Sequence, residues 1–357
     1  MLPRGYVMHI SRPLRIWFSE MRKAIIGAIL ILCVPTLRAE QKNVRLLTGM
    51  SDLELQRTMN FIRASLGVHC DFCHVVNKDT GWDFPSDAKQ TKRAARKMIE
   101  MVQEINQQNF EGNLEVSCNT CHRGTTRPVA LPPLPQTPPV FPTPVTTAPT
   151  GLPTRDAVVA KYAAAIGDAS RFKLSRILKG TREGFDGKST PFEAQISDGK
   201  VHVIAETPLG HTEQVFTGSA GWVKTDKGVT KMTDTDIERF RSLTDAYEPL
   251  APQAIPADAR VARTEKIGDH DTVVVTARLD ERSRQRLYFD TTTGLLVRRL
   301  ILTREPIGEV PQQTDFDDYR DVGGTKFPFM IRVSLVDPWN SATRHLTDVQ
   351  LGAKVEE

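Results

Sequence analysis

Between residues 70 and 122 the chain shows one pattern twice, as Cys70-Asp71-Phe72-Cys73-His74 and as Cys118-Asn119-Thr120-Cys121-His122. In a Cys-x-x-Cys-His pentapeptide the two thiols can add to the two vinyl groups of one haem, and the next imidazole can reach its iron. The sequence therefore predicts two covalently bound haem c groups. The predicted thioether residues are Cys70, Cys73, Cys118 and Cys121, and the predicted iron ligands within the motifs are His74 and His122.

Two other kinds of site also use paired cysteines. A zinc site built from two Cys-x-x-Cys knuckles has a gap of roughly 15–20 residues between them, whereas 44 residues separate Cys73 from Cys118. A thioredoxin-like redox pair requires a βαβ pattern, which surrounds neither motif. A histidine follows both cysteine pairs although the chain has only 8 histidines in 357 residues, and this coincidence favours haem.

The N-terminal segment has the features of a secretory signal. Arg22 and Lys23 precede a short apolar run at 24–37, and the small residue Ala39 follows it. We expect residues 1–39 to be a signal peptide, with Met21 as the alternative start, and the protein to be exported to the periplasm or the outer side of a bacterial membrane. An uncleaved membrane anchor is the other interpretation. Cys33, the fifth cysteine, lies in this run.

The composition is that of a globular protein with ordinary charge. Hydrophobic residues make up 39% of the chain and charged residues 25%, and the formal net charge is +4. The basic residues are interspersed with acids and form no tract interleaved with aromatic residues, so nucleic acid is not an expected partner.

Helices are expected before each motif. Ser51 and Glu54 form a capping box that begins a helix, which Gly67 ends. A second helix is expected from Ser86 and Asp87 to about Gln108. The apolar face of the first helix contains Leu55, Met59, Ile62 and Leu66, and that of the second contains Ala94, Met98, Met101, Val102 and Ile105.

The sixth ligands of the two irons are expected on these helices. A methionine stripe on a helix usually belongs to a core, but a haem is the only large group that so short a module can pack around. Met59 is the candidate for the first iron and Met98 for the second, with Met101 as the rival of Met98.

Residues 51–128 resemble half of the tetrahaem cytochrome subunit of photosynthetic reaction centres. The similarity includes Ala95-Arg96-Lys97-Met98, the following Ile105-Asn106, and the run 116–124 around the second motif. In that family a methionine of this phrase and a helical methionine before the first motif bind iron, which implies Met98 and Met59 here. The chain departs from the family by a shorter connection before Cys118 and by having no histidine there for a further haem, which fits a two-haem protein.

A proline-rich segment marks a domain boundary. Residues 128–154 hold ten prolines and are expected to form an extended spacer. We therefore expect a dihaem cytochrome domain at 40–127 and a second domain at 155–357. The second domain begins with an expected helix at 155–166, and a charged helix is expected near 233–247. The expected strands are 191–196, 200–206, 213–218, 221–225, 261–267, 272–278, 284–289, 295–303, 314–319, 326–336 and 342–349.

The strands predict a sheet with one buried side. Val273, Val275 and Ala277 would share its apolar face, and residues 290–294 would form a hairpin turn. The phrase at 287–290, followed by Gly294-Leu295-Leu296, resembles the antiparallel half-barrel of the lipoprotein-carrier (LolA-like) class. The expected fold class is thus α+β, with a small helical dihaem module and an antiparallel half-barrel.

Three functions follow as hypotheses. The first is an exported electron carrier that exchanges single electrons with redox proteins and has no catalytic residues. The second is an envelope-associated binding or sensing protein whose β domain holds a lipid, a lipoprotein or another apolar partner. The third is a dihaem peroxidase-like enzyme, which requires one iron with an open coordination site.

Overall fold

The structure is a computed structural model. It describes residues 41–128, 151–184, 186–207, 210–234, 236–237, 240, 251–336 and 341–354. The described residues from Asn43 onward belong to one compact unit. The predicted signal, most of the proline-rich spacer and most of the charged helix near 233–247 lie outside the described residues. Within the described residues, every helix is too short or too polar to cross a membrane.

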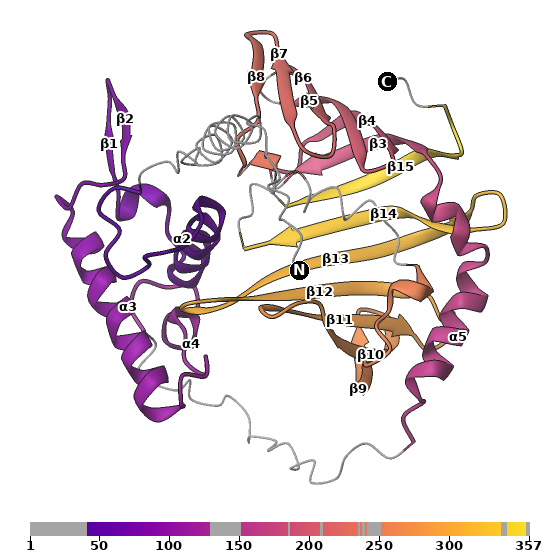
Figure 1. Cartoon of the computed structure of the whole chain (residues 1–357), viewed down its shortest axis with the longest axis horizontal. Coiled ribbons are helices and arrows are strands. Elements are labelled where there is room, and N and C mark those ends of the chain that lie inside the picture. Colours follow the sequence, from indigo (N-terminus) through magenta and orange to yellow (C-terminus); the bar gives the residue numbers. More distant parts are fainter. Residues whose placement is uncertain are drawn as a thin grey trace, which may run out of the picture. The chain divides into compact units, whose positions relative to one another are not determined.

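Residues 43–128, called here the haem-motif segment, are mainly helical. The elements are α2 (Asp52–Leu66), η1 (Cys70–Phe72), β1 (Val75–Asn77), β2 (Gly81–Asp83), α3 (Gln90–Asn109) and α4 (Cys118–His122). The prediction for α2 is confirmed: Ser51 and Glu54 form the capping box, and Gly67 ends the helix in the left-handed conformation. Both motifs therefore lie in short helical turns, each preceded by a longer helix (Figure 1).

Two local predictions for this segment are wrong. The second helix begins at Gln90 instead of Ser86, because the Asp87 carboxylate pairs with Arg45 and Arg96 and does not cap the helix. The loop that Gly81 and Pro85 predict at 78–85 instead contains the strand β2, which forms an antiparallel hairpin with β1, and in it Val76 lies opposite Trp82. Such a short hairpin has too few alternating residues to stand out in the sequence.

The C-terminal part forms an open antiparallel sheet of 13 strands in the order β8-β7-β6-β5-β4-β3-β15-β14-β13-β12-β11-β10-β9. The sheet curves but is not closed, since β8 and β9 are its edges (Figure 1). This is the predicted α+β, half-barrel-like architecture. The strands are β3 Arg176–Gly184, β4 Ser189–Ser197, β5 Lys200–Thr207, β6 Gly210–Phe216, β7 Gly221–Thr225, β8 Gly228–Lys231, β9 Arg260–Ile267, β10 His270–Arg278, β11 Ser283–Asp290, β12 Leu296–Glu305, β13 Gly308–Asp321, β14 Lys326–Leu335 and β15 Ala342–Leu351.

Every strand expected from the sequence overlaps one of these, but β3 and β8 were missed. β3 lies between its neighbour β4 and β15, the last strand, so one of its two partners is distant in the sequence. β8 is a four-residue edge strand whose residues are all exposed, and it has no apolar alternation to reveal it. The turn at 290–294 is confirmed, with Asp290 Oδ1 accepting from the backbone N–H groups of Thr292 and Thr293 at 2.9 and 2.6 Å.

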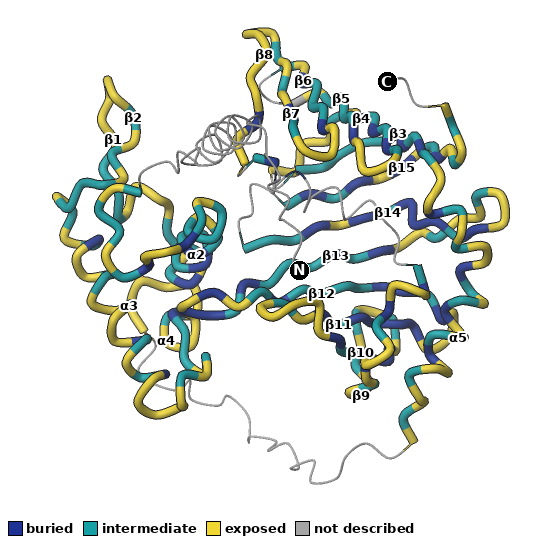
Figure 2. The backbone as a smooth tube through the Cα atoms, viewed as in Figure 1, coloured by how far each residue is buried: buried dark blue, intermediate teal, exposed yellow. Residues whose placement is uncertain are grey.

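The helix α5 (Arg155–Ile166) has the predicted bounds and packs on one face of the sheet. Thr154 caps it by accepting from the Ala157 N–H group. Its buried residues Val158, Tyr162 and Ile166 belong to the main core, and the Tyr162 ring lies 5.1 Å from that of Phe289 on β11. The buried residues form a continuous inner face along the strands, whereas α3 is largely exposed (Figure 2).

The prediction of a single buried side needs a correction. Val273, Val275 and Ala277 do line the main core. Val274, on the opposite face, is also fully buried, because it packs with Tyr288 of the adjacent strand β11 and Val297 of β12, the next strand along. Cross-strand apolar contacts therefore protect part of the outer face as well.

A second core joins the haem-motif segment to the turn between β12 and β13. Phe61 of α2, Ile99 of α3 and Cys118 of α4 pack with Ile307 and Val310, and Ile307 is fully buried. The turn comes so close that a Cβ atom on Gly308 would lie 2.6 Å from the Phe61 ring. Residues on the two sides of the proline-rich spacer thus contribute to one core.

A buried carboxylate strengthens this contact. The Glu305 side chain is 1% exposed, and its two oxygens accept from Arg57 Nε at 3.0 Å and Arg282 Nη2 at 2.7 Å. Arg282 also pairs with Glu54 of α2. Burial raises the pKa of Glu305, so the arginines are needed to keep this carboxylate charged at the contact.

Candidate haem-attachment site

The first motif occupies a single 3-10 turn. The N–H groups of Cys73 and His74 both donate to the Cys70 carbonyl, at 3.2 and 3.0 Å, which brings the two cysteines and the histidine together within about one turn of backbone. His74 Nδ1 lies 3.3 Å from the Phe84 carbonyl oxygen, a partner that leaves Nε2 available. Burial lowers the pKa of His74 and so favours the neutral imidazole that can bind a metal.

The start of α3 holds this turn in place. The Thr91 hydroxyl donates to the Phe72 carbonyl, and the Lys89 ammonium donates to the Asp71 carbonyl. Both acceptors are residues between the two cysteines of the motif. The N-cap residue and the first turn of α3 thereby satisfy carbonyl groups that a single 3-10 turn leaves without partners.

The second motif is itself the short helix α4. Ser117 precedes it, and the Ser117 N–H group donates to the Thr120 hydroxyl at 3.0 Å. Asn106 of α3, which is 3% exposed, fixes the approach to this helix: its Oδ1 accepts from the N–H groups of Glu115 and Val116, and its Nδ2 donates to the Val116 carbonyl. Asn106 thus positions the segment that leads into Cys118.

The end of α2 holds the residues after this motif. The Gly124 N–H group donates to the Ser65 carbonyl at 2.8 Å. A Cβ atom on Gly67 would lie 2.1 Å from the Gly124 carbonyl oxygen, and Gly67 has φ +65°, so this position requires glycine. His122 Nδ1 lies 3.0 Å from the Thr125 carbonyl, which again leaves Nε2 available.

The four motif cysteines differ in exposure. Cys70 and Cys121 are exposed, Cys73 is half-buried and Cys118 is buried. Burial raises the pKa of Cys118 to about 11 and also raises that of Cys73. These thiols are therefore neutral at physiological pH. In each motif one cysteine faces the protein and the other is more open to solvent.

The candidate methionines lie on the two longer helices, as expected. Met59 on α2 is half-buried and packs against the core shared with the β12–β13 turn. Met98 and Met101 on α3 are 44% and 41% exposed, three residues apart and thus on one face of the helix. The two residues are equivalent in exposure and face, and the choice between them stays a prediction.

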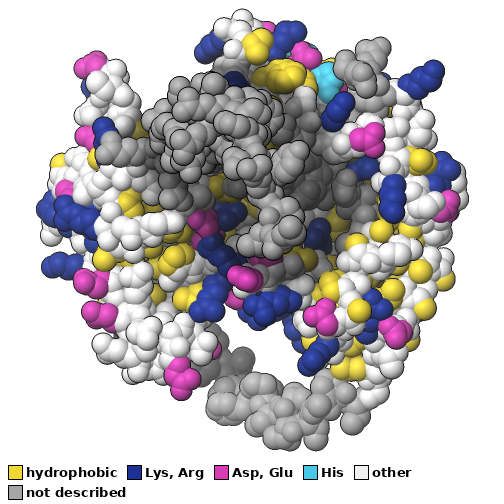
Figure 3. Space-filling view, in the orientation of Figure 1, with side chains coloured by type: hydrophobic (Ala, Val, Ile, Leu, Met, Phe, Trp, Pro, Cys, Tyr) yellow, Lys and Arg dark blue, Asp and Glu magenta, His cyan; other side chains and the backbone are white. Residues whose placement is uncertain are grey.

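The haem-motif segment has several large apolar side chains that are partly exposed to solvent. Phe72, Val76, Trp82, Phe84, Met98, Met101 and Phe110 are each between 37% and 51% exposed, and the rings of Trp82 and Phe84 stack 5.3 Å apart. Hydrophobic side chains reach the surface among lysine and arginine residues on the face shown in Figure 3. The residues thus fit a large apolar ring system next to thiols and a neutral imidazole.

Some residues that shape the site gave no signal of their role in the sequence. Lys92 and Asn106 act through backbone carbonyl and N–H groups, and Asp87 through its ion pair with Arg96, and these partners come together only in the fold. The two cysteine pairs lie on separate elements, η1 and α4. In the part of the chain that the structure describes, no three His, Cys, Asp or Glu side chains group together as a metal site would require.

Comparison with known proteins shows that this segment matches a protein family. Residues 33–138 match the family described as Photosynthetic reaction centre cytochrome C subunit. Cytochrome c-554 of Chloroflexus aurantiacus is 37% identical over 87 residues, which are 22% of this chain and 20% of that protein. The photosynthetic reaction center cytochrome c subunit of Rubrivivax gelatinosus is 34% identical over 97 residues, or 26% and 25% of the two chains. The chain therefore spans only a fifth to a quarter of the length of these relatives.

Solved structures resemble the other part of the chain. A domain from Vibrio parahaemolyticus described as a putative outer membrane lipoprotein-sorting protein matches over 56% of this chain and 93% of its own, with 11% identity and a TM-score of 0.36. A LolA superfamily protein from Nitrosomonas europaea covers 57% and 96%, also with 11% identity and a TM-score of 0.36. The haem-motif segment, within residues 33–138, is thus similar to the cytochrome c subunit of photosynthetic reaction centres.

Proposed function

We propose that this protein is an exported dihaem c-type cytochrome that transfers single electrons. The observation that carries the proposal is the pair of Cys-x-x-Cys-His turns, each with its histidine Nδ1 beside a backbone carbonyl. Similarity of residues 33–138 to reaction centre cytochromes supports it independently. A haem supplies a one-electron couple between its ferrous and ferric states.

The residues divide into two sets, one for each haem. Cys70 and Cys73 would form the thioethers of the first haem, and His74 with Met59 would bind its iron. Cys118 and Cys121 would attach the second haem, and His122 with Met98 would bind its iron, with Met101 as the rival. The exposed apolar side chains of the segment would cover the ring edges.

The other residues of the segment hold these ligands in position. Thr91 and Lys89 fix the first turn, and Asn106 fixes the approach to the second. α2 carries Met59 and also holds Gly124 beyond the second motif. Because one helix contacts both motif regions, the two haems would lie close enough to exchange electrons. Redox proteins of the periplasm or of the outer side of a bacterial membrane are the proposed partners.

A potentiometric titration with absorption spectroscopy tests this function. We expect two one-electron steps and low-spin spectra in both oxidation states, because two axial ligands on each iron leave no open site. A weak near-infrared band of the methionine–iron bond is expected in the oxidised protein. A five-coordinate ferric spectrum at one iron would contradict the electron-carrier proposal and favour a peroxidase-like enzyme.

A further inference from the structure

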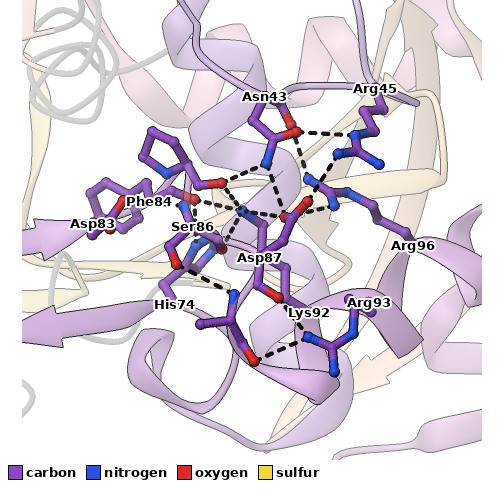
Figure 4. Close-up of polar contacts among 12 residues, drawn as sticks. Asn43, Arg45, His74, Asp83, Phe84, Ser86, Asp87, Lys92, Arg93 and Arg96 are labelled. Carbon is purple, nitrogen blue, oxygen red and sulfur yellow. Dashed lines mark hydrogen bonds and ion pairs between the residues drawn. The ribbon is translucent and has the colours of Figure 1, made fainter.

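Lys92, in the first turn of α3, points back over the loop that follows β2. Its ammonium donates to three successive backbone carbonyls, those of Phe84 at 2.7 Å, Pro85 at 3.1 Å and Ser86 at 2.9 Å. An ammonium group has three N–H donors, and here each meets one acceptor (Figure 4). Lys92 is only 9% exposed, which is unusual for a lysine and indicates a fixed position.

The Phe84 carbonyl is shared between this lysine and the first motif. It lies 2.7 Å from Lys92 Nζ and 3.3 Å from His74 Nδ1 (Figure 4). A carbonyl oxygen has two lone pairs and can accept from both groups. The Lys92 ammonium and the His74 imidazole, which is proposed to bind the first iron, therefore share one hydrogen-bond acceptor.

A carboxylate anchors this arrangement. Asp87 lies 3.4 Å from Lys92 Nζ, 2.7 Å from Arg96 and 3.0 Å from Arg45. Asn43 donates both to Asp87, at 2.9 Å, and to the Pro85 carbonyl, at 2.5 Å. These hydrogen bonds lower the pKa of Asp87 to about 2, so the carboxylate stays charged. Three cations surround one anion, and the cluster keeps a positive charge beside His74.

We propose that Lys92 is a positioning residue that raises the reduction potential of the haem at His74. A hydrogen bond from Nδ1 to a strong acceptor makes an imidazole a better donor to iron and favours the ferric state. Because Lys92 already draws electron density from the Phe84 carbonyl, this carbonyl is a weaker acceptor for the N–H group of His74. The nearby positive charge also disfavours the ferric state, which carries one more positive charge than the ferrous state. Both effects raise the reduction potential.

This inference rests on the proposed haem attachment at His74, and Lys92→Met tests it. The change keeps the apolar length of the side chain but removes the ammonium. We expect two haems per chain and an unaltered absorption spectrum. At a fixed solution potential the ratio of ferric to ferrous iron in the first haem should rise about tenfold, which corresponds to about 59 mV for one electron. The haem at His122 should keep its potential.

Matched variants separate the proposal from simpler explanations. Lys92→Arg retains the charge and should restore most of the potential. Lys78→Met removes an exposed lysine from the β1–β2 turn and should leave both potentials unaltered. If Lys92→Met folds poorly, Lys92→Gln replaces the ammonium with a neutral amide that can still donate hydrogen bonds. The same rise in the ratio of ferric to ferrous iron is expected in the first haem.

Three results would overturn the proposal: an unaltered potential in Lys92→Met or Lys92→Gln, an equal fall in Lys78→Met, or an equal fall at both haems. Failure of the proposed function itself has a different signature, because the wild-type protein would then carry no haem.

Discussion

Replacing Met98 with alanine is expected to lower the reduction potential of the haem at His122 and to open its iron to carbon monoxide. A thioether is a neutral, soft ligand that favours ferrous iron, and axial ligands set haem potentials over a span of roughly 0.8 V. We expect a fall on the order of 0.1–0.3 V, measured by potentiometric titration, and about half of the near-infrared methionine band should disappear. The haem at His74 should keep its potential.

Met101→Ala is the matched control, because Met101 has nearly the same exposure on the same face of α3. It should leave both potentials and the band unaltered. The opposite pattern, with the band lost in Met101→Ala and kept in Met98→Ala, would assign the ligand to Met101. If neither variant alters the spectrum, the second iron has another ligand or none, and the enzyme hypothesis gains support.

Met59→Ala should act in the same way on the haem at His74 but with an added effect. Met59 packs against the core formed with the β12–β13 turn, so its truncation also removes buried apolar contacts. Loss of stability alone would therefore not identify a ligand. The readouts that do so are a lowered potential and carbon monoxide binding at one haem only.

Ile307→Ala is expected to lower the free energy of unfolding of the whole chain by about 2–5 kcal/mol, the usual cost of truncating a fully buried isoleucine. Ile307 is 0% exposed and lies in the turn between β12 and β13, where it packs with Phe61, Ile99 and Cys118. Urea unfolding followed by haem absorbance and by far-ultraviolet circular dichroism measures the effect. Both signals should shift, since one core supports the haem-motif segment and the sheet.

Val229→Ala provides the control for this experiment. Val229 lies on the edge strand β8 and is 67% exposed, so its truncation should change stability by less than about 0.5 kcal/mol. A shift of the circular dichroism signal in Ile307→Ala without any shift of haem absorbance would show that the haem-motif segment does not depend on this turn.

Patterns that are local in the sequence predicted the structure well. The capping box at Ser51 and Glu54, the bounds of α5 and the turn after Asp290 were all predicted correctly, because each depends on residues a few positions apart. The α+β class and most of the strands were predicted from alternation of apolar residues.

Features that depend on distant partners could not be predicted. β3 is stabilised by β15, and the β12–β13 turn packs on α2 and α4, which lie far away in the sequence. Asp87 looked like a helix cap but serves instead as a partner for Arg45 and Arg96. The Lys92 side chain acts on carbonyl groups, which have no signature in the sequence of side chains. The ligand residues carry their own chemistry and could be proposed at once, whereas the residues that position them could not.

The haem content of the purified protein is the most direct test of the proposed function. A pyridine haemochrome assay, combined with mass spectrometry of the intact chain, counts the covalently bound haems. We expect two haem c groups per chain, one remaining in a Cys70→Ala/Cys73→Ala variant and one in a Cys118→Ala/Cys121→Ala variant. A chain that carries zinc and no haem would contradict the proposed haem attachment and, with it, the proposed function.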